Sequence, residues 1–331
     1  MTYRSPSLSV EAYERGVIDG DRGMLARAVT LIESRSEHDR HLAHNLLQRV
    51  LPRTGRAYRI GITGVPGVGK STFIDNFGMH LLSTGHRVAV LAIDPSSQLS
   101  GGSILGDKTR MHRLALDTRA FVRPSPSGLS PGGVARRTRE TMLLCEAADY
   151  DVVLIETVGV GQGETAVADM VDFFLVLVLP GSGDELQGIK KGVFELADTL
   201  VVNKADGDGE RLARVALTDL NAALRYLPRK RKIWQPRVLA ASGLTGLGIK
   251  ELWTVIEEHR HLLESTGELT ALRASQQSKW MWALIRERLE DAFRQHPDVS
   301  SILPRIEQAV EAGTTTSSAA ADELLSIFSR K

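Results

Sequence analysis

Apolar residues along the chain follow two different periods, and these periods divide it into three regions. Residues 1–57 carry apolar side chains at three- and four-residue spacing, which predicts helices. Residues 58–263 alternate short apolar runs with helical stretches, and residues 264–331 return to the helical spacing. We therefore predict one α/β domain with an N-terminal helical extension and a C-terminal helical arm.

The apolar runs of the central region predict strands that are covered on both faces. Most of them are unbroken rather than alternating with polar residues, which is typical of a parallel sheet with crossover helices. The expected strands are Tyr58–Thr63, Arg87–Ile93, Ala120–Arg123, Asp151–Ile155, Phe173–Leu179, Thr199–Val202 and Arg237–Ala241. The predicted fold class is α/β, a mostly parallel sheet flanked by helices.

A phosphate-binding loop follows the first of these strands. The segment from Gly64 to Ser71 matches G-x-x-x-x-G-K-[ST], in which backbone N–H groups and a helix N-terminus surround phosphate oxygens. Lys70 supplies a cation for the terminal phosphates, and the Ser71 hydroxyl is a ligand for Mg²⁺. The residues expected to bind nucleotide here are Gly64, Val65, Pro66, Gly67, Val68, Gly69, Lys70, Ser71 and Thr72.

A guanine-binding motif, Asn203-Lys204-Ala-Asp206, follows a later predicted strand. An aspartate accepts hydrogen bonds from both N1–H and the exocyclic amine of guanine, and adenine has no donors in those positions. A site built on that pair leaves a carboxylate unpaired when ATP enters, which disfavours ATP by several kcal/mol. Ala241 and Ser242, after the next apolar run, are a weaker match to a loop that closes over the base.

Acidic residues end two further strands. Glu156 is placed to hold Mg²⁺ directly or through water, and the backbone of Gly159 can turn toward the γ-phosphate. Asp94 opens a Ser/Gly-rich stretch that also contains Asp107, and such a stretch can fold over phosphates as a switch segment. Asp94 is equally explained as part of an Asp-Pro turn.

The positions of these motifs predict one shared site. Gly64, Asp94, Glu156, Asn203 and Ser242 each come directly after a predicted strand, and parallel strands end at the same edge of a sheet, where ligands bind. We predict a site for GTP or GDP with Mg²⁺ that hydrolyses GTP.

The catalytic residues of that predicted site are Lys70, Asp94 and Glu156. Its metal ligands come from Ser71, Asp94, Asp107 and Glu156. Asp94 is the first choice to orient the attacking water. No residue corresponds clearly to the water-positioning glutamine of Ras-like proteins, so slow intrinsic hydrolysis is expected.

Longer segments resemble the MeaB/MMAA/ArgK family of GTPases, which belongs to the SIMIBI class. The resemblance is carried by Gly61–Thr72, Ala92–Ser97, Ser100–Met111, Glu156–Gln162 and Asn203–Asp206, and it covers residues 58–263. It implies a GTPase that acts as a chaperone of adenosylcobalamin-dependent methylmalonyl-CoA mutase. The mutase is expected to accelerate GTP hydrolysis by the chaperone. It also implies gating of cofactor loading, protection and rescue of the mutase, and a homodimer formed through the arm at 264–331. The resemblance also implies switch and partner-coupling roles for Arg110, Asp184, Gln187 and Lys190.

The composition of the chain argues against several classes of partner and function. The chain of 331 residues has 41 Lys and Arg against 40 Asp and Glu, so its net charge of +1 favours neither nucleic acid nor an anionic membrane as partner. No apolar run is long enough for a membrane span or an export signal, which predicts a cytoplasmic protein. A metal-delivery GTPase would need metal-binding segments, but the chain has one cysteine, Cys145, and nine scattered histidines.

A small-molecule kinase could use the same phosphate loop, although the guanine motif argues against ATP.

Three further features have plain structural interpretations. We interpret Cys145 as a core residue. The basic cluster Arg136–Arg139 is interpreted as a solvated start of a helix, and the histidines at 38, 41 and 44 as a solvated helix face.

Overall fold

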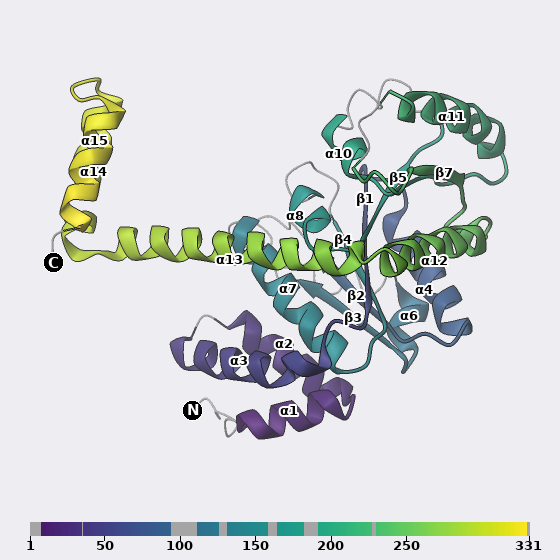
Figure 1. Cartoon of the computed structure of the whole chain (residues 1–331), viewed down its shortest axis with the longest axis horizontal. Coiled ribbons are helices and arrows are strands. Elements are labelled where there is room, and N and C mark those ends of the chain that lie inside the picture. The colour runs from purple at the N-terminus through teal and green to yellow at the C-terminus, as the bar shows by residue number, and fades with distance from the viewer. Residues whose placement is uncertain are drawn as a thin grey trace. The chain divides into compact units, whose positions relative to one another are not determined.

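A parallel sheet in the order β3-β2-β4-β1-β5-β6-β7 organises the described part of the chain (Figure 1). The computed structural model describes residues 8–34, 36–93, 111–125, 131–157, 164–181, 191–226 and 230–329. The strands are β1 (Tyr58–Gly64), β2 (Val88–Ile93), β3 (Ala120–Ser125), β4 (Val152–Glu156), β5 (Phe173–Val178), β6 (Thr199–Val202) and β7 (Arg237–Ala240). All neighbouring pairs are parallel. The predicted α/β class is therefore confirmed.

Helices connect the strands and extend the chain at both ends. Three of them, α1 (Val10–Ile18), α2 (Arg22–Glu33) and α3 (Glu37–Val50), precede the sheet, with a 3-10 turn η1 (Leu51–Arg53) after them. The connecting helices are α4 (Lys70–Ser83), α6 (His112–Leu116), α7 (Pro131–Ala147), α8 (Glu164–Ala168), α10 (Lys191–Leu196) and α11 (Gly209–Leu224). After β7 come α12 (Ile249–Ser265), α13 (Glu268–Gln295), α14 (Pro297–Glu311) and α15 (Ser317–Phe328).

Two apolar cores lie on the two faces of the sheet. Alternate residues of each strand point to opposite faces, so Val152 and Leu154 enter one core while Val153 and Ile155 enter the other. The first core also contains residues of α4 and α12, and the second contains residues of α7, α8 and α11. Burial on both faces explains why the strand sequences are unbroken apolar runs.

The N-terminal helices belong to the second core. Val17, Leu25 and Leu46, one from each of α1, α2 and α3, are at most 1% exposed and lie in the same cluster as residues of β4 and α7. Side-chain bonds add to this packing, since Arg123 of β3 donates to Glu33 of α2 at 2.6 Å. These helices therefore cover one face of the sheet on the β3 side.

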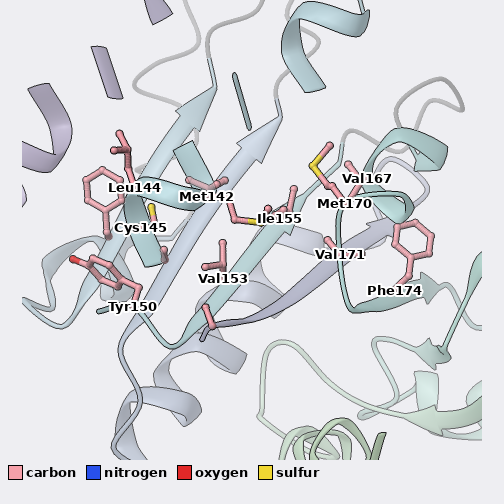
Figure 2. Close-up of a cluster of buried hydrophobic side chains, with 14 of the residues drawn as sticks. Met142, Leu144, Cys145, Tyr150, Val153, Ile155, Val167, Met170, Val171 and Phe174 are labelled. Atoms are coloured by element: carbon pink, nitrogen blue, oxygen red, sulfur yellow. The ribbon is translucent and has the colours of Figure 1, made fainter. Parts of the chain in front are cut away.

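Cys145 lies inside this core, as predicted. It is fully buried on α7, and Figure 2 shows it with Met142, Leu144 and Tyr150 near the strand that carries Val153. Burial raises the pKa of its thiol far above the ordinary value, because the thiolate has no solvation there. The side chain is an inert packing residue.

The basic cluster of α7 differs in part from the prediction. Arg136 pairs with Glu140 at 3.1 Å, but Arg139 donates from Nη2 to the carbonyl oxygen of Asp169 at 2.6 Å. Burial lowers the pKa of Arg139 to about 10, against the opposing charge of Asp169. The expectation of a solvated helix start is therefore wrong for Arg139, because the helix turns it toward the residue that follows α8.

Contacts divide the chain into two compact units, residues 1–272 and 273–331. The second has a small core of its own, built from Val299, Ile306, Ala320 and Leu324 of α14 and α15. Within the described residues, we find no helix whose length and apolar character would suit a membrane crossing.

Candidate functional site

The carboxyl edge of the sheet brings the predicted motifs together. β1 runs directly into the phosphate loop, β4 ends on Glu156, β6 is followed by Asn203, and β7 is followed by Ala241. Parallel registry places these ends side by side, since Ile62 of β1 pairs with Glu156 and Val202 of β6 pairs with Ala240. The topology confirms that one edge carries the described motifs.

The phosphate loop spans from Gly64 to α4 and is anchored in the core by Val68, which is fully buried. Gly67 and Gly69 have φ values of +81° and +92°, a left-handed backbone conformation that residues other than glycine rarely adopt. Gly69 is the N-cap of α4, so Lys70 is the first residue of that helix. Of the remaining loop residues, Val65 is half-buried and Pro66 exposed.

Lys70 lies over its own loop. Its Nζ donates to the carbonyl oxygens of Gly64 at 2.8 Å and Val65 at 3.3 Å. Burial lowers the pKa of Lys70, and the negative charges of Glu156 and Glu164 act in the opposite direction. Lys70 is therefore a half-buried ammonium whose hydrogen bonds go to two carbonyl oxygens of its own loop.

Ser71 and Glu156 form a pair of oxygen donors next to this lysine. The Ser71 hydroxyl donates to Oε1 of Glu156 at 3.1 Å, and the Glu156 side chain is 7% exposed. Magnesium is bound by one or two carboxylates together with substrate phosphates, rather than by an all-protein cage. The donor set therefore fits Mg²⁺. Among the described residues, no cluster of three or more His, Cys, Asp or Glu is suited to hold a metal ion.

Asn203 and Lys204 connect the phosphate loop to the base-binding side of the site. Asn203 donates from Nδ2 to the carbonyl oxygen of Val68 at 2.8 Å and accepts at Oδ1 from the N–H of Gly243 at 2.9 Å. Lys204 donates from Nζ to the carbonyl oxygen of Gly67 at 2.9 Å. Both side chains thus brace the loops, which leaves Asp206 as the member of the motif with a carboxylate available to a base.

The loop after β7 is held in a tight turn. The Ser242 hydroxyl accepts from the N–H groups of Leu244 at 3.2 Å and Thr245 at 3.0 Å, and Ala205 donates to the carbonyl oxygen of Ala241 at 3.0 Å. Ser242 is therefore a structural hydroxyl that shapes the loop.

One pocket of about 630 Å³ unites the phosphate loop with the base motif, a volume suited to a nucleotide. It is lined by Gly69, Thr72, Leu179, Pro180, Asn203, Lys204, Asp206, Asp208, Gly209, Leu212, Ser242, Gly243 and Leu244. Asp206 and Asp208 supply the acidic groups, and three leucines supply apolar walls. The leucines and Asp208 were not predicted, because they become neighbours only when α11 and the loop after β7 converge.

Glu164 is a further site residue that the sequence reasoning missed. It is the first residue of α8 and 5% exposed, and its charge acts on Lys70. The available signal was a glutamate three and four residues before the apolar pair Val167 and Ala168, which places all three on one helix face.

Seven predicted residues lie outside the described part of the chain. They are Asp94, Asp107, Arg110, Gly159, Asp184, Gln187 and Lys190. Their assignments to metal, γ-phosphate and partner coupling stay predictions.

Comparison with known proteins gives a family and close relatives. The family model described as "Methylmalonyl Co-A mutase-associated GTPase MeaB" matches residues 25–298. The GTPase ArgK of Escherichia coli is 49% identical over 85% of this chain and 84% of its own. The mouse mitochondrial methylmalonic aciduria type A homolog is 46% identical over 96% of this chain and 79% of its own. A crystal structure of a protein named LAO/AO transport system kinase is 39% identical and has a TM-score of 0.78. The match covers 97% of this chain and 98% of the other.

Proposed function

Because this chain belongs to the MeaB family of methylmalonyl-CoA mutase-associated GTPases, we propose that its pocket binds GTP and hydrolyses it with Mg²⁺. The observation that carries the proposal is the single pocket in which Gly69 and Thr72 of the phosphate-loop segment meet Asp206 of the guanine motif. A pocket shared by these two groups of residues supports a guanine nucleotide as its ligand.

Specificity for guanine rests on Asp206. Its carboxylate accepts from N1–H and from the exocyclic amine, and adenine offers no donor at either position. Asn203 and Lys204 support this recognition by holding the phosphate loop at the carbonyl oxygens of Val68 and Gly67. Entry of ATP would leave the Asp206 carboxylate facing a nitrogen lone pair, which costs several kcal/mol.

Hydrolysis follows from the groups around the phosphate loop. Water attacks the γ-phosphate in line, and the Lys70 ammonium moves from the carbonyl oxygens of its loop to the phosphate oxygens, where it neutralises the developing charge. Ser71 and Glu156 would hold Mg²⁺, which neutralises phosphate charge when it is bound. Asp94 is proposed to orient the attacking water, with Asp107 in the same metal or switch set and Gly159 at the γ-phosphate.

The partner is a methylmalonyl-CoA mutase, to which the family name refers. We propose that the mutase accelerates the slow hydrolysis, and that the GTPase gates loading of the cobalamin cofactor and protects or reactivates the mutase. Arg110, Asp184, Gln187 and Lys190 are proposed to couple the nucleotide state to the mutase.

A homodimer is proposed to form through the C-terminal arm at 264–331. On α13, Met281, Trp282 and Leu289 are 49%, 55% and 56% exposed, which supports an apolar contact between two copies.

The rate of GTP hydrolysis with and without purified methylmalonyl-CoA mutase tests the function. We expect slow turnover alone and a clear acceleration on adding the mutase, with Lys70→Ala inactive in both conditions. Rapid hydrolysis by the isolated protein would contradict partner activation. Failure to form a complex and failure to accelerate would remove the chaperone role and leave the GTPase.

A small-molecule kinase is the second candidate, because the solved relative at 39% identity carries the name of a kinase. Calorimetry with GTP and ATP separates the two functions. Binding of ATP alone would favour the kinase, whereas binding of GTP alone supports the assignment of Asp206.

A further inference from the structure

The chain contains three Asp-Gly pairs, and these differ in whether the glycine N–H is held by an acceptor. The pairs are Asp19–Gly20, Asp206–Gly207 and Asp208–Gly209. The N–H of Gly20 donates to the carbonyl oxygen of Val17 at 3.0 Å, and the N–H of Gly209 donates to the carbonyl oxygen of Asp206 at 3.0 Å. Among the hydrogen bonds of the described residues, none has the N–H of Gly207 as its donor. The backbone nitrogen of Gly207 is therefore the one that no hydrogen bond restrains.

The bond between Asp206 and Gly207 lies in an open turn beside the pocket. This turn leads from β6 into α11, and within it Asp206 is half-buried and Gly207 exposed. A Cβ placed on Gly207 would meet no atom within 4 Å. Asp206 lines the pocket, and its carboxylate forms no hydrogen bond or ion pair within the described part of the chain. Neither the carboxyl group nor the neighbouring nitrogen is thus shielded or engaged.

An aspartate carboxyl and the nitrogen of the next residue can close a five-membered succinimide ring. The Gly207 nitrogen attacks the side-chain carbonyl carbon of Asp206, and an N–C bond forms. The C–O bond to the hydroxyl of the protonated carboxyl breaks, and that hydroxyl leaves with the N–H proton as water. Glycine favours this closure because it has no Cβ to hinder the approach.

Water then opens the ring at one of two carbonyl carbons. Opening at the side-chain carbonyl restores aspartate. Opening at the main-chain carbonyl gives isoaspartate, in which the main chain runs through the former side-chain carbon. The whole sequence releases one water and consumes one, and it needs no other reactant.

We propose that Asp206 is a site of spontaneous isoaspartate formation, and that a bound guanine nucleotide protects it. The inference rests on the nucleotide site proposed above. Guanine occupies the Asp206 carboxylate with N1–H and the exocyclic amine, so the group stays ionised and is kept from the Gly207 nitrogen. Isoaspartate lengthens the main chain by one carbon and shortens the side chain by one, so the product loses the paired hydrogen bonds that distinguish guanine.

The nucleotide-free protein and the protein saturated with GDP are incubated warm at neutral pH and sampled over weeks. Trypsin releases residues 205–211 as one peptide, and electron-transfer fragmentation assigns isoaspartate within it to Asp206 or Asp208. In the nucleotide-free sample we expect several-fold more isoaspartate at Asp206 than at Asp208 or Asp19, which serve as matched controls in the same chain. GDP should suppress the conversion at Asp206. The fraction of protein that still binds GTP should fall in step with the fraction converted.

Gly207→Ala tests the attacking nitrogen. Its methyl group enters open space and hinders ring closure, so conversion at Asp206 should slow several-fold. Alanine is strained at the φ of +53° found here, so each aged sample is compared with its own fresh preparation. Equal conversion at all three aspartates, no conversion at Asp206, or conversion that GDP does not slow would overturn the proposal. Failure of the fresh wild-type protein to bind any guanine nucleotide would instead overturn the proposed function.

Discussion

Asn203 holds two loops of the nucleotide site together, which makes its side chain a sensitive point for stability. Its amide donates to Val68 in the phosphate loop at 2.8 Å and accepts from Gly243 in the loop after β7 at 2.9 Å. The residue is 2% exposed. Asn203→Ala removes both bonds and leaves a carbonyl oxygen and an N–H group without partners in a buried place.

The magnitude follows from those two groups. A buried donor or acceptor that loses its partner costs about 1–3 kcal/mol, so for the two groups together we expect the free energy of unfolding to fall by about 2–6 kcal/mol. That is a large part of the roughly 5–15 kcal/mol that stabilises a typical domain. Affinity for GDP should fall as well, because Gly243 and Gly69 line the same pocket.

Urea unfolding of the nucleotide-free protein is the suitable assay, because bound nucleotide would itself stabilise the fold. Asn76→Ala is a matched control, since Asn76 lies on α4 and its side chain bonds to the same loop after β7. Asn76 donates to the carbonyl oxygens of Gly243 and Leu244 at 3.2 and 3.4 Å and is half-buried, so its loss should cost less than about 1 kcal/mol. A loss for Asn203→Ala no larger than for this control would refute the reasoning.

Three further outcomes are expected. Asp206→Asn should weaken GTP binding at least tenfold and favour xanthosine triphosphate, whose O2 accepts a bond from the new amide; nucleotide competition measures this. Burial lowers the pKa of His259 to about 4, so between pH 6.5 and 4 only the unfolded chain binds the proton. The free energy of unfolding should therefore fall by roughly 3 kcal/mol as the pH is lowered through this range. His259→Gln should reduce this pH dependence in urea unfolding. Glu146→Gln should cost about 3–5 kcal/mol in thermal unfolding, since it leaves the buried guanidinium of Arg59, now 2.6 Å from the carboxylate, without its counter-ion.

The sheet and the shared edge of the site were predictable from sequence for a physical reason. Strands buried on both faces leave unbroken apolar runs, and parallel strands bring whatever follows them to one edge. Gly64, Glu156 and Asn203 each follow such a run, so their proximity required no knowledge of the loops. The observed strand bounds fall within two residues of the expected ones.

The functions of individual side chains depended on contacts between distant elements, which periodicity does not contain. Asn203 looked like a base-reading residue, but its amide is used by the backbone groups of Val68 and Gly243 from two other loops. Arg139 looked solvated, yet α8 lies close enough to accept its hydrogen bond at Asp169.

Glu164 shows how such a contact changes the chemistry of the site. In sequence it is a charged residue at the start of a short helix, where water would be the default surrounding. The absence of a side chain at Gly61 lets Val167 pack against β1, and Glu164 on the same face of α8 is only 5% exposed. A Cβ at Gly61 would lie 2.9 Å from both Cγ1 of Val167 and Cδ2 of Phe174, a clash that neither side chain can relieve without moving. Gly61→Ala should therefore lower the free energy of unfolding by about 1–3 kcal/mol, measured by urea unfolding, although Gly61 lies outside the phosphate-binding motif and changes none of its residues.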